Sequence, residues 1–252
     1  MFLNQSLEIK KNFQLNKKIK LYDKEYKYFI INLKRNSVVT FNNINLGTIV
    51  PLNINTNSKI LFNNETISLK KYTYLDFSKR KIKINNLKNN ISFLIAGIKK
   101  NIKNQHLNYY TEKFLYKVVK PWGHEIWING EQKTYSIKKI LIKKGFKTSL
   151  QFHQKKIETN FIFKGRSKLY YSGKNGKHNK DLILDNLKTI VLHKNNVINV
   201  KRLAVHRIEA LTNLTLFEVS TPQLDDVIRI EDDNSRKSGR INAEHIKNKK
   251  KG

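Results

Sequence analysis

The chain of 252 residues has no cysteine, and its 50 Lys and Arg against 19 Asp and Glu give a formal net charge of +31. This length fits one large domain or two small ones, and the lack of cysteine excludes disulfides, thiolate metal sites and cysteine catalysis. Lysines are spread along the whole sequence beside many Asn and Ile, residues with AT-rich codons, so gene composition explains much of the charge. We expect weak, salt-dependent adhesion to polyanions and no specific nucleic-acid partner.

The first residues do not place an apolar segment after a basic one, which is the pattern of a signal peptide. No apolar run approaches the ~20 residues that span a bilayer. The absence of cysteine suits a reducing compartment. Together these features predict a cytoplasmic protein without a membrane partner.

Residues 1–115 read as short strands separated by Asn-rich turns. Their spacing is typical of a β-sandwich or barrel, and no helical periodicity of useful length interrupts them. His106 is the only histidine in this half, so we predict a β domain without a histidine metal site, followed by a polar linker or an interdomain strand over 101–117. The predicted strands are Tyr26–Asn32, Ser37–Phe41, Gly47–Pro51, Ser58–Phe62, Ile67–Leu75, Ile82–Asn86 and Ile91–Gly97.

The second half continues the pattern of short strands. An acidic segment, 225–233, follows the last of them, and we expect its carboxylates to pair with Arg229 or Arg236 as a structural clasp. From Asn234 to Gly252 the sequence is polar and charged, which predicts a disordered basic tail. The predicted strands are Ile137–Lys143, Thr189–His193, Val197–Val200 and Leu214–Val219, with a hairpin that pairs Leu169–Tyr171 with Leu182–Leu184.

Two short strands joined by a turn are predicted over residues 145–165. On the first strand, Ser149, Gln151 and His153 alternate with two apolar residues. Successive side chains of a strand point to opposite faces, so these three polar groups share one face. Polar groups on one face of an otherwise apolar strand are expected where that face borders a cavity.

A mixed nitrogen and oxygen metal site is predicted on this face. Glu158 opens the second strand, and a hairpin of this length can bring its carboxylate back beside the imidazole of His153. His206 follows far downstream in the apolar context Leu203–Ile208. A single buried histidine is more often a structural residue than a ligand. Gln151, His153, Glu158 and His206 on converging strands would instead hold a divalent ion and leave room for water or substrate.

Six blocks of sequence in this half resemble one protein family in residue type and in order. The blocks are Lys120–Trp127, Ser149–His153, Glu158, Val205–Ala210, Glu218–Pro222 and Leu224–Asp233. Over about 116–236 they are similar to the cupins of the type II mannose-6-phosphate isomerase group, which also form the C-terminal domain of some mannose-1-phosphate guanylyltransferases. The resemblance implies an all-β protein with a cupin domain, a double-stranded β-helix or jelly-roll barrel, at 116–233 and the basic tail at 234–252. It also suggests a bicupin in which 1–115 is a degenerate cupin, with another small β domain as the alternative.

The sequence departs from the family pattern in two places. Lys155 stands where many cupins have a second His, two residues after the first, and Gln151 would supply the missing ligand. Residues 201–203 replace the Pro-Pro-Gly turn that usually precedes the last His of the family. The loop that delivers His206 is therefore less well defined by the sequence.

The resemblance implies the interconversion of mannose 6-phosphate and fructose 6-phosphate on a divalent transition metal. The ligand set suits Zn, with Mn or Fe as alternatives, and such an ion polarises a carbonyl and stabilises the adjacent enediolate. Lys138, Lys155 and Lys156 are the candidates for binding the phosphate of a sugar phosphate or sugar nucleotide. Arg207 ranks below them, because it follows His206 directly and a regular strand would turn it to the opposite face.

Glu218 or a metal-bound hydroxide is the candidate base for this reaction. The alternative function is a non-catalytic module that binds sugars or sugar nucleotides or takes part in assembly, and the missing second His favours it. A metal-independent sugar epimerase would need a His–Asp pair, and no such spacing appears. Cupins often dimerise by strand exchange, so a homodimer is the default expectation.

Overall fold

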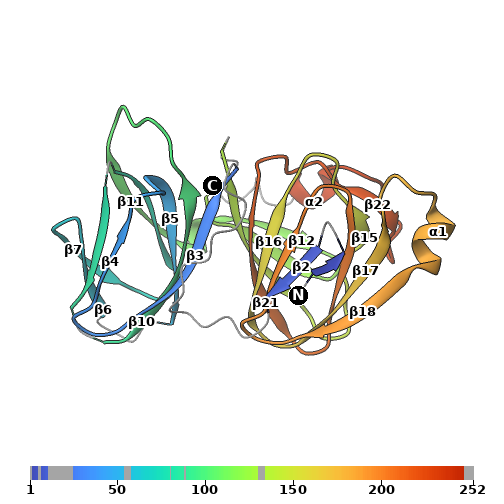
Figure 1. Cartoon of the computed structure of the whole chain (residues 1–252), viewed down its shortest axis with the longest axis horizontal. Helices are drawn as coiled ribbons and strands as arrows, with labels where there is room; N and C mark the ends of the chain where they lie inside the picture. The colour runs from blue at the N-terminus through green and yellow to red at the C-terminus, as the bar shows by residue number, and fades with distance from the viewer. Residues whose placement is uncertain are drawn as a thin grey trace. The chain divides into compact units, whose positions relative to one another are not determined.

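The computed structural model describes residues 2–4, 7–10, 25–53, 58–79, 81–87, 89–129 and 134–246 (Figure 1). Within these ranges the predicted all-β fold is confirmed, with two short α-helices and one 3₁₀ turn between the strands. Neither helix is long and apolar enough to cross a membrane. The chain divides into two compact units. We call them the N-terminal domain (Gln14–Leu115 and Gln132–Tyr135) and the C-terminal domain (Met1–Phe13, Tyr116–Glu131 and Ser136–Gly252).

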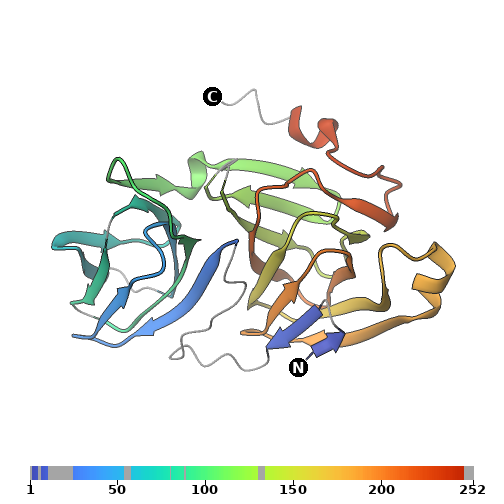
Figure 2. The same ribbon diagram turned by 45° about the horizontal axis from the view of Figure 1, so that its top comes forward.

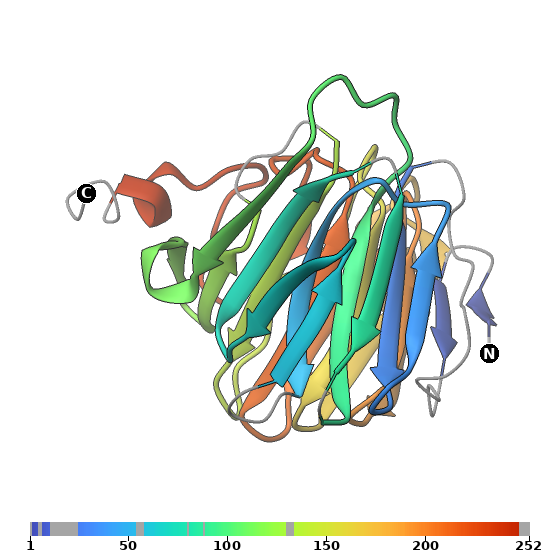
Figure 3. The same cartoon turned by 90° about the vertical axis from the view of Figure 1, so that its left-hand side faces the viewer.

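Two antiparallel sheets make up the N-terminal domain, and Figure 3 shows their strands from the side of this domain. One sheet has the order β11-β8-β5-β10-β3, and the other has the order β4-β9-β6-β7. The region expected to be a linker contains the edge strand β11 and the 3₁₀ turn η1. The elements are β3 Lys27–Leu33, β4 Val38–Phe41, β5 Leu46–Asn53, β6 Ser58–Phe62, β7 Glu65–Leu69, β8 Thr73–Ser78, β9 Ile82–Asn86, β10 Ile91–Ile98, β11 His106–Thr111 and η1 Glu112–Phe114.

Alternation of apolar and polar residues builds the core of this domain. Along β6 and β9 every second side chain is buried, because one face of each strand points inward. The buried cluster is entirely aliphatic and aromatic, and the rings of Phe62 and Phe77 lie 5.4 Å apart within it. At Gly97 a Cβ would lie 2.1 Å from the carbonyl oxygen of Leu46, so glycine permits the close approach of β10 to β5.

One predicted strand of this domain is wrong. Ile67–Leu75 is not continuous but forms the two strands β7 and β8. Tyr72 adopts a φ of 63°, and the N–H of Thr73 donates to the carbonyl of Lys70 at 3.2 Å, which reverses the chain. The turn reads Lys-Lys-Tyr, without the Gly, Pro or Asn that usually marks such a reversal.

The C-terminal domain also contains two antiparallel sheets. Their orders are β1-β2-β19-β16-β21-β14-β13-β12 and β18-β17-β20-β15-β22. The main apolar cluster takes residues from both sheets, so the core lies between them. The strands are β1 Phe2–Asn4, β2 Leu7–Lys10, β12 Tyr116–Lys120, β13 Gly123–Trp127, β14 Ser136–Ile142, β15 Leu150–Phe152, β16 Glu158–Lys164, β17 Ser167–Asn175, β18 Leu187–Leu192, β19 Val197–Val200, β20 Ala204–Ala210, β21 Leu214–Ser220 and β22 Ile228–Glu231.

The first strands of the chain belong to this second unit, unlike the expected boundary at residue 115. Figure 2 shows them in dark blue within the C-terminal domain. β2 pairs with β19, so that Leu7 lies opposite Val200. Leu7 is fully buried in the core of this domain, and this burial explains why the segment adds to its sheet.

A short helix replaces one strand of a predicted hairpin. Leu182–Leu184 lies in α1, Lys180–Asp185, and β17 pairs instead with β18. The side chain of Asn179 accepts a hydrogen bond from the N–H of Leu182 at 2.9 Å and caps the helix. Ile183 is buried and anchors α1.

The tail was expected to be disordered from Asn234, and the structure contradicts this up to residue 246. The segment ends in the helix α2, Asn242–Ile246. The carboxylate of Glu244 lies 2.6 Å from the ammonium of Lys120 and 3.2 Å from the guanidinium of Arg236. Both ion pairs are largely buried, so charge pairing orders a segment that is polar by composition.

Candidate metal centre and its cavity

Three side chains from three different strands or their ends converge in the C-terminal domain. His153 follows β15, Glu158 is the first residue of β16, and His206 lies in β20. The antiparallel pairing of β15 with β20 places Gln151 opposite His206. One ligand atom from each of His153, Glu158 and His206 lies within 4.8 Å of the others, and all three residues are buried. The structure thus brings together three of the four residues predicted as metal ligands.

The two imidazoles face the same carboxylate. Nε2 of His206 lies 3.1 Å from Oε1 of Glu158, and Nε2 of His153 lies 3.3 Å from Oε2. Nδ1 of His206 donates to the carbonyl of Ala204 at 2.9 Å, and Nδ1 of His153 donates to the carbonyl of Asp226. A carbonyl only accepts, so in the neutral rings the proton sits on Nδ1 and the Nε2 lone pairs face the carboxylate.

This arrangement fits a metal ion. Two lone pairs directed at a carboxylate repel it unless a cation or protons lie between them. Nε2 of His153 is buried and makes no well-aligned hydrogen bond within the described residues. Backbone carbonyls that fix the tautomer of both rings are the usual support of metal-binding histidines. Two imidazole nitrogens and one carboxylate oxygen suit Zn, Mn or Fe.

The protonation states agree with this assignment. Burial lowers the pKa of His153, and the positive charge of Lys156 lowers it further, so the ring is neutral near pH 7. Burial alone would raise the pKa of Glu158, but the charged ammonium of Lys156 outweighs it and holds that pKa well below its usual value. The carboxylate is therefore charged, and the neutral imidazole of His153 is available as a ligand.

Lys156 adds a buried ammonium beside the three ligands. Its Nζ lies 2.6 Å from Oε2 of Glu158 and 2.8 Å from Oε1 of Glu218. Burial by itself lowers the pKa of Lys156, yet the two carboxylates raise it well above the usual value, so the group stays charged. The amide of Asn160 donates to Oε1 of Glu158 at 3.0 Å. Glu158 thus contacts an ammonium, an amide and two imidazoles.

A cavity of about 100 Å³ opens from this centre. Glu158 and His206 line it, together with six Lys and Arg residues and three further carboxylates. Aromatic, aliphatic and uncharged polar side chains form the rest of its wall. The charged lining residues are Lys120, Glu125, Lys138, Lys156, Glu158, Glu218, Asp225, Arg229, Arg236 and Arg240.

Four of the other predicted site residues also line the cavity. Gln151 does so, and its Oε1 accepts a hydrogen bond from the hydroxyl of Ser149 at 2.5 Å. The Nζ of Lys138 lies 3.3 Å from Glu125 and 4.8 Å from the centre of the Trp127 ring. Lys156 and Glu218 form the buried ion pair described above. The cavity therefore contains Gln151, the predicted base and two of the predicted lysines.

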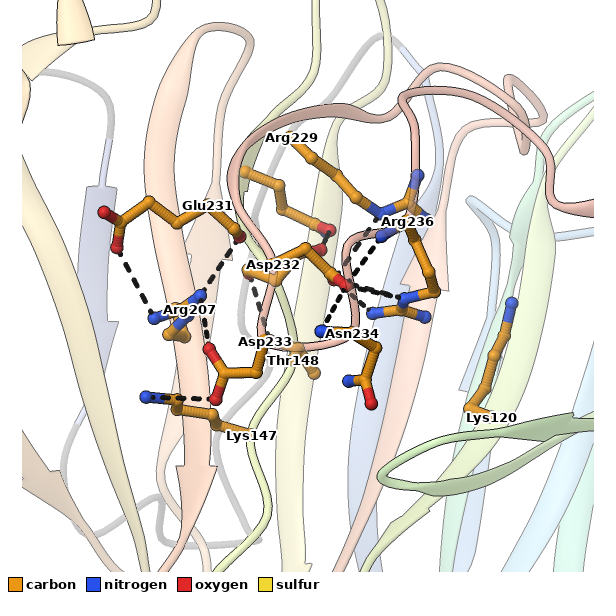
Figure 4. A network of polar contacts seen from close by, with 12 residues as sticks. Lys120, Lys147, Thr148, Arg207, Arg229, Glu231, Asp232, Asp233, Asn234 and Arg236 are labelled. Atoms are coloured by element: carbon orange, nitrogen blue, oxygen red, sulfur yellow. Dashed lines mark hydrogen bonds and ion pairs between the residues drawn. The ribbon is translucent and has the colours of Figure 1, made fainter.

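Two predicted substrate-binding residues lie elsewhere. Lys155 is exposed and does not line the cavity. Arg207 points to the opposite face of β20, where its guanidinium donates to the carbonyl of Glu231 at 3.0 Å and to Asp233 at 3.3 Å (Figure 4). These contacts occupy Arg207 in a structural role, so it is not a phosphate ligand of this cavity.

Sequence reasoning missed the contribution of the tail to the cavity. Arg236, Arg240 and His245 all line it, although the segment was expected to be disordered. Arg236 was named only for the clasp, and its guanidinium does bind Asp232, at 2.6 Å (Figure 4). The signal that could have located these residues is the acidic Glu244 that follows Arg236 and Arg240 in an otherwise basic tail.

Strands in two antiparallel sheets around an apolar core, with a buried histidine and carboxylate centre at one cavity, define a cupin. Residues 108–232 match the family model of the mannose-6-phosphate isomerase C-terminal domain. This part of the chain belongs to that family, and the resemblance carried by the six sequence blocks is confirmed. No curated protein matches the chain.

Solved cupin structures share the fold over both domains. Oxalate decarboxylase from Lactobacillus farciminis, as a formate complex, is 12% identical over 81% of this chain and 79% of its own, with a TM-score of 0.58. Oxalate decarboxylase from Bacillus subtilis, which has Mn(II) centres, is 10% identical over 78% and 69%, with a TM-score of 0.56. A variant of salicylate 1,2-dioxygenase from Pseudoaminobacter salicylatoxidans is 10% identical over 78% and 71%, with a TM-score of 0.55. Each match extends over more residues of this chain than the C-terminal domain contains, so each also includes part of the N-terminal domain. This extent is in keeping with a bicupin.

Proposed function

We propose that this protein is a metal-dependent cupin that acts on a phosphorylated sugar, with interconversion of an aldose phosphate and a ketose phosphate as the reaction. The observation that carries the proposal is the pair of buried imidazoles whose Nε2 atoms both face the carboxylate of Glu158. The family match supports mannose 6-phosphate as the substrate. His153, Glu158 and His206 would hold one divalent ion. Gln151, which pairs with His206 across strands β15 and β20, would supply an amide oxygen as a further ligand.

The bound ion would supply a positive charge that stabilises negative charge on the oxygens of an enediolate. Glu218 is the residue that would take the proton from C2 of the aldose and return it to C1, while one proton leaves the O2 hydroxyl and one is added to O1. Lys156 holds Glu218 through a 2.8 Å contact and keeps its carboxylate oriented. The ring of Trp127 and the walls of the cavity would limit the access of water.

A coupled assay for fructose 6-phosphate formed from mannose 6-phosphate tests this function. The purified protein, loaded in turn with Zn, Mn and Fe(II), should turn over at least with one of them. Glu218→Gln keeps the shape of the side chain and removes the base, so turnover should fall by about 10²–10⁴-fold while the bound metal is retained. Full turnover by Glu218→Gln would refute the role of Glu218, and no turnover with any metal would refute the isomerase proposal.

A non-catalytic sugar-binding module is the second candidate, and Lys156 favours it. Its ammonium lies 2.6 Å from a carboxylate oxygen that would otherwise serve the ion. The buried charges of Lys156, Glu158 and Glu218 therefore offset one another in part even without a metal. In this reading the cavity would bind a sugar phosphate or sugar nucleotide without chemistry.

Removing the ammonium separates the two candidates. In Lys156→Gln, metal affinity should rise by about tenfold, because a cation no longer competes for Glu158. Without metal the same variant should lose about 3–5 kcal/mol of stability, because Glu158 and Glu218 lose their buried partner. Metal titration followed by calorimetry measures the affinity, and thermal unfolding of the metal-free form measures the stability. A variant that binds no metal under any condition would support the binding module.

A further inference from the structure

The tail segment 236–245 forms one wall of the cavity and lies beyond the residues that match the family model. His245 holds this wall in place. Its Nδ1 lies 2.8 Å from the hydroxyl of Tyr116, its ring stacks on Tyr116 with centroids 5.9 Å apart, and it meets the edge of Trp127 at 5.7 Å. The tail is therefore packed against β12 and β13, and its side chains have fixed positions at the cavity.

Four cations approach the cavity at this wall, and the carboxylates that pair with two of them lie behind it. Arg236 donates to Asp232 through Nε and Nη2 (Figure 4), while Lys120 contacts Glu244 at 2.6 Å. Neither Asp232 nor Glu244 lines the cavity. Lys120 also lies 3.9 Å from Glu125, which does line the cavity. Six Lys and Arg side chains and four carboxylates line the cavity, so the surface that a ligand meets keeps a net positive charge.

Arg229 is the third cation, and it is incompletely satisfied. Its Nη1 donates to the carbonyls of Lys237 and Gly239, the latter at 3.0 Å. Its Nε is buried and has no hydrogen-bond acceptor in the described part of the chain, since the carboxylate of Asp232 lies 3.9 Å away. Burial and the neighbouring guanidinium of Arg236 lower the pKa of Arg229, which indicates positive charge that is not fully compensated.

Arg240 is the fourth cation and the most accessible. A third of its side chain is exposed. Its guanidinium lies 3.9 Å from the carboxylate of Asp225, which is itself 58% exposed, and 3.5 Å from Nδ1 of His245. Exposed pairs of this kind contribute little, so an incoming anion can replace Asp225. The planar donors of a guanidinium match the oxygens of a phosphate better than an ammonium does.

We propose that Arg240 and Arg229, with Lys120, form an anion subsite on the tail wall that binds the phosphate group of the ligand. The choice of a phosphate ester rests on the proposed function, whereas the subsite itself does not require turnover. It assigns a binding role to a segment outside the matched family region. The sugar would then extend from this wall across the cavity toward Glu158 and His206, which line the same space.

Arg240→Gln tests the subsite, with Lys237→Gln as the matched control. Both variants remove one positive charge from the tail, but Lys237 is exposed and does not line the cavity. Binding of inorganic phosphate and of mannose 6-phosphate is measured by titration calorimetry at about 0.15 M salt, which screens non-specific attraction to the basic surface. The Kd of both probes should rise about tenfold in Arg240→Gln, as loss of a charge-assisted hydrogen bond predicts, and stay within about twofold in Lys237→Gln.

The outcomes separate this inference from the proposed function. Arg240→Gln with the affinity of the unaltered protein would overturn the subsite, even if the protein isomerises mannose 6-phosphate. Weaker binding in Arg240→Gln without any turnover would uphold the subsite and refute the isomerase. If the protein is an isomerase, KM should rise about tenfold in Arg240→Gln while kcat is unchanged. Arg240→Glu should abolish phosphate binding with an unchanged unfolding temperature and metal content, and retained binding in that variant would also overturn the subsite.

Discussion

The two domains of this chain are both built from antiparallel sheets, yet their interiors differ in chemistry. The main cluster of the N-terminal domain is wholly aliphatic and aromatic. The C-terminal domain has an apolar cluster of the same kind, but its sheets also enclose the buried charges of Lys156, Glu158 and Glu218. The comparison teaches that a β fold provides a frame, and that a few inward-facing residues decide whether the frame holds a site.

Buried charges are a cost that only function or precise pairing justifies. Lys156 and Glu158 are each less than 5% exposed, and an unpaired ion in such a place loses several kcal/mol of solvation. Among the described residues of the N-terminal domain, Asp76 is the one buried charged group, and its carboxylate accepts a hydrogen bond from Thr48 at 2.8 Å. We therefore expect the C-terminal domain to lose function, and the N-terminal domain to lose stability, when an interior residue is replaced.

The largest expected effect is on metal binding by the C-terminal domain. His206→Ala removes one of three ligands and should lower metal affinity by at least about 100-fold. His106→Ala is the matched control from the N-terminal domain, where the ring lies 3.6 Å from Asp76 and has no second histidine beside it in the described residues. Metal content by elemental analysis should fall in the first variant only. Equal loss in both variants would mean that the ion is not bound at the site described.

Next in size is the loss of core packing in the N-terminal domain. Phe62→Ala removes a fully buried ring beside Phe77 and should cost about 3–5 kcal/mol of unfolding free energy. Chemical denaturation measures this loss, and the metal content per folded molecule should not change. If Phe62→Ala also releases the metal, metal binding in the C-terminal domain depends on the core of the N-terminal domain. The two interiors would then not be independent, as the comparison assumes.

A third effect depends on pH and concerns Glu125 of the C-terminal domain. Burial would raise its pKa, but Lys138 and Lys120 and a hydrogen bond from Trp127 hold the pKa at about 2, below the unfolded value of 4.5. Ionised Glu125 therefore stabilises the folded state fully above about pH 4.5, and this stabilisation is lost as the pH falls toward 2. The loss in unfolding free energy amounts to at most about 3 kcal/mol. Glu125→Gln should flatten this part of the stability curve, measured by denaturation between pH 5 and 2. An unchanged slope would show that other carboxyl groups dominate.

The smallest effect is expected on the surface of the N-terminal domain. Lys79 pairs with Glu65 at 3.0 Å, and the carboxylate is 54% exposed. Lys79→Ala should change the unfolding free energy by less than about 1 kcal/mol. A larger loss would mean that the surface charges of this basic chain contribute more than solvent screening allows.

Much of the fold could be predicted because strand burial leaves a period of two in the sequence. β6, β9 and β19 have the predicted bounds, and other strands are shifted by a few residues. The break between β7 and β8 could not be predicted, because Tyr72 takes a left-handed conformation that its residue type does not favour. The helix α1 has a capping Asn179 that the sequence does show, but its short length resembles a strand.

The site was predictable only in part, and the reason is geometric. His153, Glu158 and His206 follow a known family pattern, so their convergence could be expected. β15 ends at Phe152, and residues 153–157 form no strand, so alternation could not tell that Lys156 points inward and Lys155 outward. The order of the tail depends on ion pairs between residues more than 100 positions apart, such as Lys120 with Glu244, which no local pattern reveals.

The most direct test of the central claim is the metal content of the unaltered protein. The protein, purified without a metal-affinity column, should contain about one transition-metal ion per chain when it is analysed by elemental mass spectrometry. The ion should leave on chelation and return on addition of Zn, Mn or Fe(II), with a rise in the unfolding temperature of the C-terminal domain. A folded protein that stays free of metal after exposure to all three ions would contradict the metal centre at His153, Glu158 and His206.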